Sequence, residues 1–300
     1  MRLRHLGYVG QNLTIDRTTN RTLRLASLNA ERVREVVASN LAALRAILEW
    51  NVTQGISLFR IGSSIVPFAS HPAFPIDWQT EFSAQLADIR AFAETHGLRL
   101  SMHPGQYTVL NSPDAQIVAR SVLELEYHAR FLAAVAPHNG TMTLHVGGLY
   151  GDKETALARF RANAEHLPRQ VRSRLTLEND DKVYPIRDVL GLSETLGIPA
   201  VFDIFHHKCN PGSEDWRDLH DLLERVVASW GGRVPKLHLS SAREPGKSAH
   251  ADYVTEQDLS ELERLMAAVA SDAVYDVMLE AKMKDKALLA VLHRRVPATP

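Results

Sequence analysis

The stretch LRLSMH, at residues 98–103, predicts a short β-strand that ends on a histidine. Apolar and polar residues alternate along it, and successive side chains of a strand point to opposite faces of the sheet. The apolar face would pack against helices, which leaves His103 at the end of a polar face. Barrel interiors are ordinarily filled by Val, Ile and Leu, so a polar inner face at a strand end indicates a functional site.

The same kind of segment recurs from one end of the chain to the other. Seven further strands are expected, at residues 5–10, 57–62, 141–146, 174–179, 200–205, 234–239 and 275–280. Helical patterns alternate with them near residues 30–50, 79–96, 114–136, 153–167, 186–196, 214–229, 256–270 and 285–294. Eight strands in strict alternation with eight helices indicate an α/β protein with parallel strands and crossover helices. The count of eight, and the lack of a GxGxxG fingerprint after the first strand, favour a (β/α)₈ TIM barrel, predicted as a single domain over residues 1–300.

Composition excludes several other classes of protein. The chain has 300 residues, of which 45% are hydrophobic and 23% charged, as expected of a globular protein with a sizeable core. Its one cysteine, Cys209, excludes a disulfide scaffold and a cysteine-based zinc finger. No apolar run has the length of a signal peptide or a membrane span, so we expect a soluble, cytoplasmic protein without a membrane partner.

The formal net charge of −1 conceals an uneven distribution along the chain. Residues 1–34 contain seven arginines against two acidic residues, a local charge of +5. Such a segment could neutralise phosphate groups, or it could be a solvated basic start without a partner.

Six predicted strands, from the third to the eighth, each end close to a histidine or a carboxylate. These residues are His103, His145, Glu178, Asp203, His238 and Glu280. Barrel enzymes keep their active sites at the carboxyl ends of the strands, and adjacent strands are about 4.8 Å apart. We therefore expect the six side chains to converge, although any one of them alone could be a core histidine or a member of an internal ion pair.

Imidazoles combined with carboxylates form a mixed nitrogen and oxygen donor set that suits Zn²⁺, Mn²⁺ or Fe²⁺. The donors outnumber what one ion needs, and carboxylates can bridge, so two or three metal ions are expected at the C-terminal face. Such clusters lower the pKa of bound water to about 7 and hold the oxygens of a displacement at phosphorus. The chemistry that this set favours is hydrolysis of a phosphodiester.

Seven motifs, in order along nearly the whole chain, resemble those of the UV damage endonuclease family. They are YVGQN (8–12), HPGQYTVLNSP (103–113), HVGGLYGDK (145–153), LENDD (177–181), FDIFHHKCNP (202–211), KLHLSS (236–241) and LEAKMKDKALL (279–289). The resemblance implies a TIM barrel, Mn²⁺ as metal, and cleavage of DNA immediately 5′ of UV photoproducts and some other lesions. It also implies damaged double-stranded DNA as partner, and we expect a monomer in the bacterial cytoplasm, associated with the nucleoid when on DNA. The endonuclease IV family of apurinic-site nucleases is similar at a greater distance.

The endonuclease IV resemblance implies a division of the ligands among three metals. His103 and His145 would hold the first metal with Glu178, which would bridge to a second held by Asp203, His238 and Glu280. His206 and His250 would hold the third, but Ser248 stands where that family has an aspartate.

Lys236 is a candidate substitute for the missing carboxylate. It shares the predicted inward face with His238, where a bare ammonium beside metal ions is unfavourable. Carboxylation of its amine would make it an anion. The alternative is an ordinary charged lysine paired with a carboxylate of the barrel.

Further roles are expected in the loops. His71 could approach the scissile phosphate as an acid or an electrostatic clamp, or it could be an ordinary loop histidine. Gln106 and Tyr107 could fill the gap left by a flipped nucleotide. Tyr8 and Asn12 could contact the DNA strand or a flipped base. The alternatives are loop packing for the tyrosines and Gln106, and a turn role for Asn12.

Two other functions compete with a nuclease. A sugar isomerase on the same barrel would have a carboxylate-rich site with one dominant histidine, and this chain has too many strand-end histidines for that. A non-enzymatic module that binds DNA lesions would not need so many metal ligands.

Overall fold

The computed structural model of the chain describes residues 1–212, 216–244, 246–269 and 272–295, and for residues 216–218 the backbone alone. These residues form two compact units. The middle unit is Gly10–Thr176, and the terminal unit joins Met1–Val9 to the chain from Leu177 onward. Residues 214, 215 and 270, at the ends of two predicted helices, and residues 296–300 of the predicted domain lie outside the described residues.

Three parallel strands organise the middle unit. They are β4 (Leu58–Arg60), β5 (Arg99–Met102) and β6 (Thr141–His145), in this order across the sheet. In their register Arg60 lies opposite Ser101, and Ser101 lies opposite Thr141. All of β5 is buried, as is typical of parallel strands that are covered on both faces. The carboxyl ends of the three strands therefore lie at one edge.

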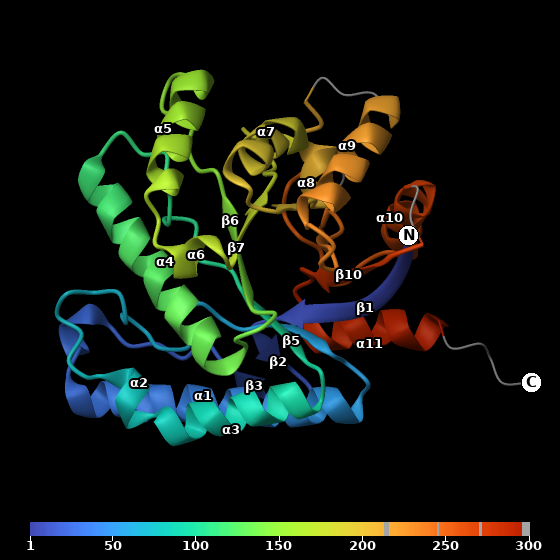
Figure 1. Cartoon of the computed structure of the whole chain (residues 1–300). Coiled ribbons are helices and arrows are strands. Elements are labelled where there is room, and N and C mark those ends of the chain that lie inside the picture. Colours follow the sequence, from blue (N-terminus) through green and yellow to red (C-terminus); the bar gives the residue numbers. More distant parts are fainter. Residues whose placement is uncertain (213–215, 245, 270–271, 296–300) are drawn as a thin grey trace, which may run out of the picture. The chain divides into compact units, whose positions relative to one another are not determined.

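The predicted helices of the middle unit are present, with one interruption. They are α1 (Ala30–Thr53), α2 (Trp78–Glu81), α3 (Ser83–Thr95), α4 (Ala115–Val135) and α5 (Lys153–Glu165), and a further short helix that was not predicted, α6 (Arg169–Arg172), follows them. Figure 1 shows α1 and α3 packed side by side. The single helix predicted at 79–96 is wrong in detail. Asp77 caps the short helix α2, and Phe82 lies outside helical structure and separates α2 from α3.

The segment between the strand predicted at 5–10 and the helix predicted near 30–50 contains a small hairpin. Its strands are β2 (Gln11–Asn12) and β3 (Arg17–Thr18), which pair antiparallel, and a 3₁₀ turn follows at Leu25–Ser27. Two-residue strands are too short to produce an alternating pattern, so the sequence carries no signal for them.

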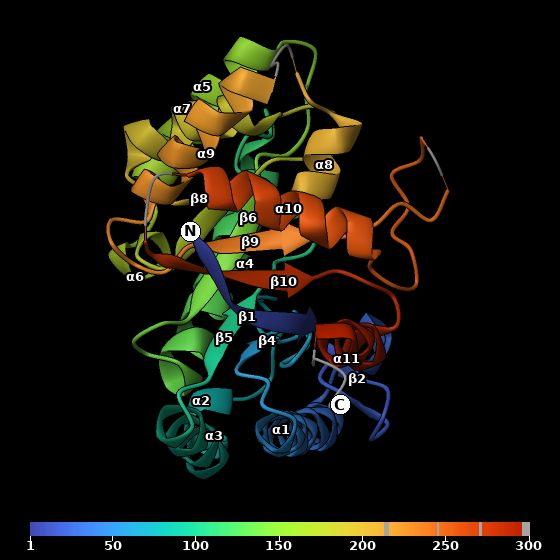
Figure 2. The ribbon, with the colours of Figure 1, turned by 90° about the vertical axis from the view of Figure 1, so that its right-hand side faces the viewer.

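In the terminal unit, β1 (Arg2–Val9), β10 (Val274–Leu279) and β9 (Lys236–Leu239) run parallel, as Figure 2 shows. The strand β7 (Leu175–Glu178), which begins in the middle unit, pairs with β8 (Ala200–Val201). A bridge between Asp203 and His238 connects the end of β8 to β9. Glu178 and His238 therefore belong to one edge of this unit's strands.

The helices of the terminal unit are α7 (Ile186–Leu196), α8 (Ile204–Cys209), α9 (Trp216–Ser229), α10 (Glu256–Ala268) and α11 (Lys284–Arg295). The strand predicted over residues 200–205 is wrong beyond Val201, because α8 begins at Ile204. The cause is local: an Asp203 side-chain oxygen accepts the backbone N–H of His206 at 2.8 Å and caps the helix. None of the described helices has the length and hydropathy that crossing a membrane requires.

Candidate metal centre

Four side chains of the terminal unit meet where its strands end. Glu178 ends β7, Asp203 follows β8, His238 lies in β9 and Glu280 follows β10. Each offers a ligand atom, and these atoms all lie within 4.8 Å of one another. Nδ1 of His238 lies 2.6 Å from Oε1 of Glu178 and 3.2 Å from Oε1 of Glu280. The group is therefore compact enough to surround a single cation.

This group is deeply buried. The side chains of Glu178, Asp203 and His238 have no exposed surface, and that of Glu280 is 12% exposed. Three carboxylates removed from water are unfavourable unless a cation or hydrogen-bond donors compensate their charge. The buried Oδ2 of Asp203 accepts no hydrogen bond within the part of the chain that is described, whereas Oδ1 caps α8. The donor set and this oxygen fit a divalent metal ion.

His206 and His250 adjoin the group. The ring centroids lie 6.1 Å apart, and Nδ1 of His206 lies 3.9 Å from both Glu178 Oε1 and Asp203 Oδ2. Nδ1 of His206 is 2.9 Å from the carbonyl oxygen of Asn179, and Nδ1 of His250 is 2.9 Å from that of Glu280. A carbonyl accepts only, so in the neutral form of both rings Nδ1 carries the proton and Nε2 has the lone pair that a metal requires.

The carboxylates also set the protonation of this site. Burial alone lowers the pKa of His206, but the carboxylates of Asp203, Glu178 and Glu280 raise it to about 9. Burial raises the pKa of Asp203, and the negative charges of Glu178 and Glu280 raise it further. The direction of both shifts indicates that the carboxylates favour a positive charge among them.

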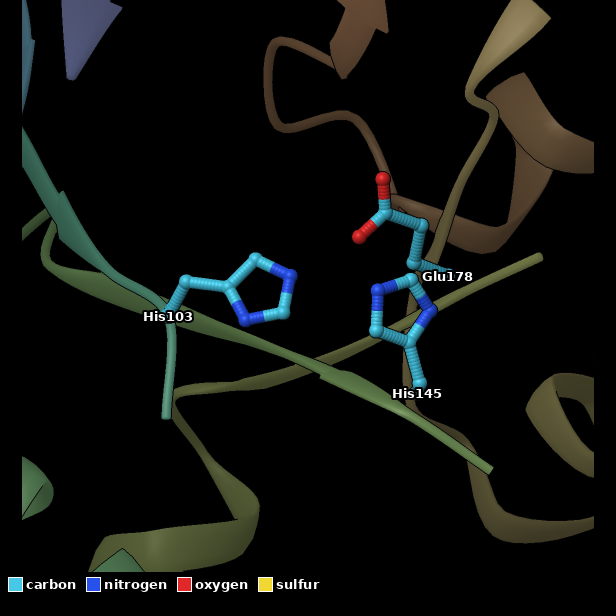
Figure 3. Close-up of side chains that lie close together, drawn as sticks. All are labelled: His103, His145 and Glu178. Atoms are coloured by element: carbon cyan, nitrogen blue, oxygen red, sulfur yellow. The ribbon is translucent and has the colours of Figure 1, made fainter. Parts of the chain in front are cut away.

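A second pair of candidate ligands lies in the middle unit. His103 directly follows β5 and His145 ends β6, and Figure 3 shows the two rings beside each other. Their centroids are 5.1 Å apart, and Nδ1 of His103 is 3.1 Å from the carbonyl oxygen of Pro104. His103 thus follows the same pattern as His206 and His250. Glu178, also labelled in Figure 3, comes from the end of β7.

Lys236 lies in β9, two residues before His238, and is completely buried. Its neighbour across the β9–β10 register is Asp276, whose carboxylate accepts hydrogen bonds from Arg4 at 2.8 and 2.6 Å. Ser248 is exposed, two residues before His250. The alternating face predicted for β9 therefore buries Lys236 together with His238.

The loop residues fall into two groups. Gln106 is exposed and Tyr107 is 84% exposed, on the loop that follows His103. By contrast, Tyr8 and Asn12 are completely buried, and the side-chain oxygen of Asn12 accepts the backbone N–H groups of Thr14 and Ile15. This placement favours the turn role for Asn12, and it leaves neither Tyr8 nor Asn12 exposed for contact with DNA.

His71 is half-buried in the loop between β4 and α2. Its Nδ1 accepts the backbone N–H of Ala73 at 3.1 Å, so Nε2 carries the proton of the neutral ring. The ring also packs edge-on against Phe68, which adopts a left-handed φ of 62°. The loop therefore holds His71 in a tautomer that presents a donor.

Asn179 is a site residue that the sequence patterns did not reveal. Its side chain accepts the N–H of Asp203 at 2.9 Å and donates to the carbonyl of Asp203 at 3.0 Å, and its own carbonyl orients His206. The signal available in the sequence was a polar residue directly after a strand-end carboxylate, and the structure shows that this asparagine is buried.

Comparison with known proteins identifies close relatives of this chain. The family model described as UV-endonuclease UvdE matches residues 4–297. A "UV DNA damage endonuclease" of Bacillus pumilus is 38% identical over 298 residues, which cover 95% of this chain and 92% of the relative. The crystal structure of SacUVDE, 38% identical, superposes with a TM-score of 0.87 and covers 97% of this chain and 98% of that one.

More distant solved structures share the fold alone. Endonuclease IV from Thermus thermophilus is 16% identical with a TM-score of 0.61, covering 97% of this chain and 98% of that one. L-ribulose 3-epimerase is 13% identical with a TM-score of 0.57, covering 86% and 84%. The predicted (β/α)₈ TIM-barrel class is confirmed. Because this family model spans residues 4–297 and the relatives are 38% identical over most of the chain, the chain belongs to the UV-endonuclease UvdE family.

Proposed function

We propose that this chain is a metal-dependent DNA repair endonuclease that acts on UV-damaged double-stranded DNA. It hydrolyses the phosphodiester immediately 5′ of the photoproduct, and it also acts at abasic sites. The observation that carries the proposal is the buried group of Glu178, Asp203, His238 and Glu280, in which Oδ2 of Asp203 accepts no hydrogen bond among the described residues. The relatives named as UV DNA damage endonucleases support the substrate class.

The mixed nitrogen and oxygen donor set would hold two or three divalent ions and suits Zn²⁺, Mn²⁺ or Fe²⁺; among these, Mn²⁺ is the metal that the resemblance to the UV damage endonuclease family implies. Glu178, Asp203, His238 and Glu280 would hold one ion, and His206 and His250 another. When bound, divalent ions lower the pKa of water to about 7 and offset the negative charge of phosphate oxygens. The three carboxylates would accept hydrogen bonds from that water and so fix its orientation.

We propose that Glu178 has a role shared with His103 and His145 and bridges two ions, as the resemblance to the endonuclease IV family implies. Glu178 lies two residues beyond Thr176 in β7, and His145 lies two residues beyond Thr143 in β6. Each of these candidate ligands is therefore on the same face of its own strand as that threonine.

Four further residues receive roles in this proposal. His71, which carries its proton on Nε2, donates to the phosphate or to the leaving oxygen. The exposed Gln106 and Tyr107 enter the duplex at the lesion, where the amide and the ring stack on neighbouring bases. Buried Lys236 is carboxylated or remains an ammonium, and native mass spectrometry before and after mild acid treatment separates the two states.

A nicking assay tests the proposal. Metal-depleted protein is incubated with end-labelled duplex, either UV-irradiated or intact, and Mn²⁺, Mg²⁺ or Zn²⁺ is added back. We expect a single cut 5′ of the photoproduct, dependent on added metal. Replacing Gln106 and Tyr107 by Ala should weaken discrimination between damaged and intact duplex without changing metal content.

The chain offers a matched control for the metal ligands. His220, Asp221 and Glu224 on α9 also form a potential ligand group, but two of the three are exposed. Asp221→Asn should leave nicking unchanged, whereas Glu280→Gln should abolish it. Tight binding of UV-irradiated duplex without nicking under any metal would instead indicate a lesion-binding module, and conversion of a ketose without nicking would indicate a sugar isomerase.

A further inference from the structure

The segment that connects β1 to α1 contains three arginines close together in the sequence, namely Arg17, Arg21 and Arg24. We call residues 17–24 the arginine loop. All three side chains are exposed. Asp16 is the only acidic residue between positions 10 and 29, so the local charge is positive.

These arginines differ from those on the neighbouring helices in lacking carboxylate partners. Arg34 binds Glu81 at 2.6 Å, Arg45 binds Asp88 at 2.9 Å, and Arg90 binds Glu94 at 3.1 Å. In the described residues no carboxylate pairs with Arg17, Arg21 or Arg24, and the hydrogen bond of the Arg17 guanidinium goes to the carbonyl of Asp16. Their charges are thus available to an external anion.

The arginine loop is held firmly in place. The hydroxyl of Thr19 accepts the N–H of Gly62 at 2.9 Å, and the side-chain oxygen of Asn20 accepts the N–H of Ser64 at 3.2 Å. Asn40 exchanges two hydrogen bonds with the backbone of Arg21, at 3.0 and 2.9 Å. A β-carbon at Gly62 would collide with the Asn20 side chain, so glycine at this position allows the close contact between Asn20 and the chain after β4.

These anchors fix where the arginine loop lies. Gly62 and Ser64 directly follow β4, and the hydroxyl of Ser63 between them donates to the carbonyl of His103 at 2.6 Å. The arginine loop is therefore attached at the carboxyl end of β4, next to a proposed metal ligand. Tyr107 is exposed on the loop that follows His103, and this loop begins at the same edge of the middle unit.

We propose that the arginine loop binds backbone phosphates of duplex DNA beside the lesion and supplies affinity that does not depend on damage. A chain with net charge −1 has no overall attraction for a polyanion, so a local group of cations must provide it. The inference rests on DNA as the substrate of the proposed function. It assigns these arginines to affinity, and neither to lesion recognition nor to hydrolysis.

The salt dependence of binding tests this assignment. Each phosphate contact adds about 0.9 to the slope of log affinity against log salt concentration. For binding of the metal-loaded protein to a short intact duplex, the magnitude of this slope should therefore be smaller than in wild type by about 1.8 in R21Q/R24Q. It should be smaller by about 2.7 when R17Q is added. R21K/R24K, which keeps the charge, should retain the slope.

A second pair of arginines provides the control. Arg169 and Arg172 lie on α6, just before the amino end of β7, and R169Q/R172Q removes the same charge. We expect this control to change the slope by less than half as much. Equal losses in both pairs, or an unchanged slope in R21Q/R24Q, would overturn the proposal.

Nicking measured on the same proteins separates this inference from the proposed function. With UV-irradiated duplex, R21Q/R24Q should keep the wild-type kcat. Measured at low salt, its KM should be higher than that of the wild-type protein. A lower kcat with an unchanged KM would overturn the assignment to affinity. If wild-type protein does not nick at all while the slope still falls in R21Q/R24Q, the proposed function fails and the phosphate-binding loop stands.

Discussion

Asp203 uses its two carboxylate oxygens for different purposes. Oδ1 caps α8 through the N–H of His206, and the buried Oδ2 lies 3.9 Å from the His206 ring. Asn179 holds the Asp203 backbone on both sides. The position of this candidate ligand is thus fixed by the start of a helix, and that fixation reduces the ordering that metal binding would require.

The first prediction concerns Glu178. Glu178→Gln keeps an oxygen that can accept from Nδ1 of His238 but removes the negative charge. We expect nicking to fall by several orders of magnitude and bound metal to decrease, as measured by nicking rates and elemental analysis. Because one of three buried carboxylates disappears, the melting temperature of the metal-free protein should not fall. Activity within tenfold of wild type would show that Glu178 is not a metal ligand.

At this scale the sequence indicates candidate ligands, but it does not indicate how each side chain is oriented. The strand-end positions of His103, His145, Glu178, His238 and Glu280 follow from alternation alone. The carbonyls that accept from His206 and His250 belong to Asn179 and Glu280, and a backbone carbonyl is identical at every position of a sequence. Only the folded chain shows which of them face a ring.

Among the elements, α8 and α10 are tied together by Asp258. Its carboxylate accepts hydrogen bonds from Lys208 of α8 at 2.6 Å, from Thr255 at 2.6 Å and from the hydroxyl of Ser241. Burial alone would raise the pKa of Asp258, but the hydrogen bonds from Lys208, Ser241 and Thr255 lower it overall. This contact supports the helix that carries His206.

We predict that Asp258→Asn lowers the free energy of unfolding by about 1–2 kcal/mol at neutral pH, after allowance for solvent screening. The folded pKa is depressed, so the stabilisation is complete above the unfolded value of about 3.9 and is lost as the pH falls through the folded value. Urea unfolding at neutral pH and at about pH 3 measures both effects. Glu256→Gln, an exposed position in the same helical turn, is the control and should cost much less. A difference from wild type that persists unchanged in acid would contradict the prediction.

The elements that sequence patterns missed are those decided by single contacts. The run AVFDIF predicts a strand by its apolar residues, yet one hydrogen bond from His206 to Asp203 turns its second half into α8. Longer elements, such as α1 and α4, were predictable because many residues contribute to their periodicity.

For the whole molecule, the division into two units crosses a strand. One of the two boundaries between the units falls between Thr176 and Leu177, inside β7, where no linker composition marks it. The sequence accordingly predicts one domain over residues 1–300, and this stays a prediction.

Metal binding should couple to the stability of the molecule in a pH-dependent manner. His206 has its pKa raised to about 9, so its protonation stabilises the metal-free protein fully below the unfolded value of about 6.5 and progressively less as the pH rises to 9. A metal ligand must be unprotonated, so metal-bound protein does not depend on that proton. We expect the increase in melting temperature on adding Mn²⁺ to grow between pH 6.5 and 9.

Differential scanning calorimetry with Mn²⁺ and with a chelator measures this increase, which corresponds to about 2.7 kcal/mol when metal is present at 100 times its Kd. His206→Gln should remove most of the pH dependence. A constant increase across this range would show that His206 is not coupled to the metal.

One consequence concerns the only thiol of the chain. Cys209 is exposed at the end of α8, three residues beyond His206. Partial burial raises the pKa of this thiol, and the carboxylates of Asp181 and Asp203 raise it further, which slows its reaction with disulfide reagents at neutral pH. A cation that neutralises Asp203 should therefore accelerate labelling of Cys209. Coloured or fluorescent thiol reagents would then report the binding of metal at this centre in real time, without DNA. Identical labelling rates with and without Mn²⁺ would mean that the charge of Asp203 is left uncompensated.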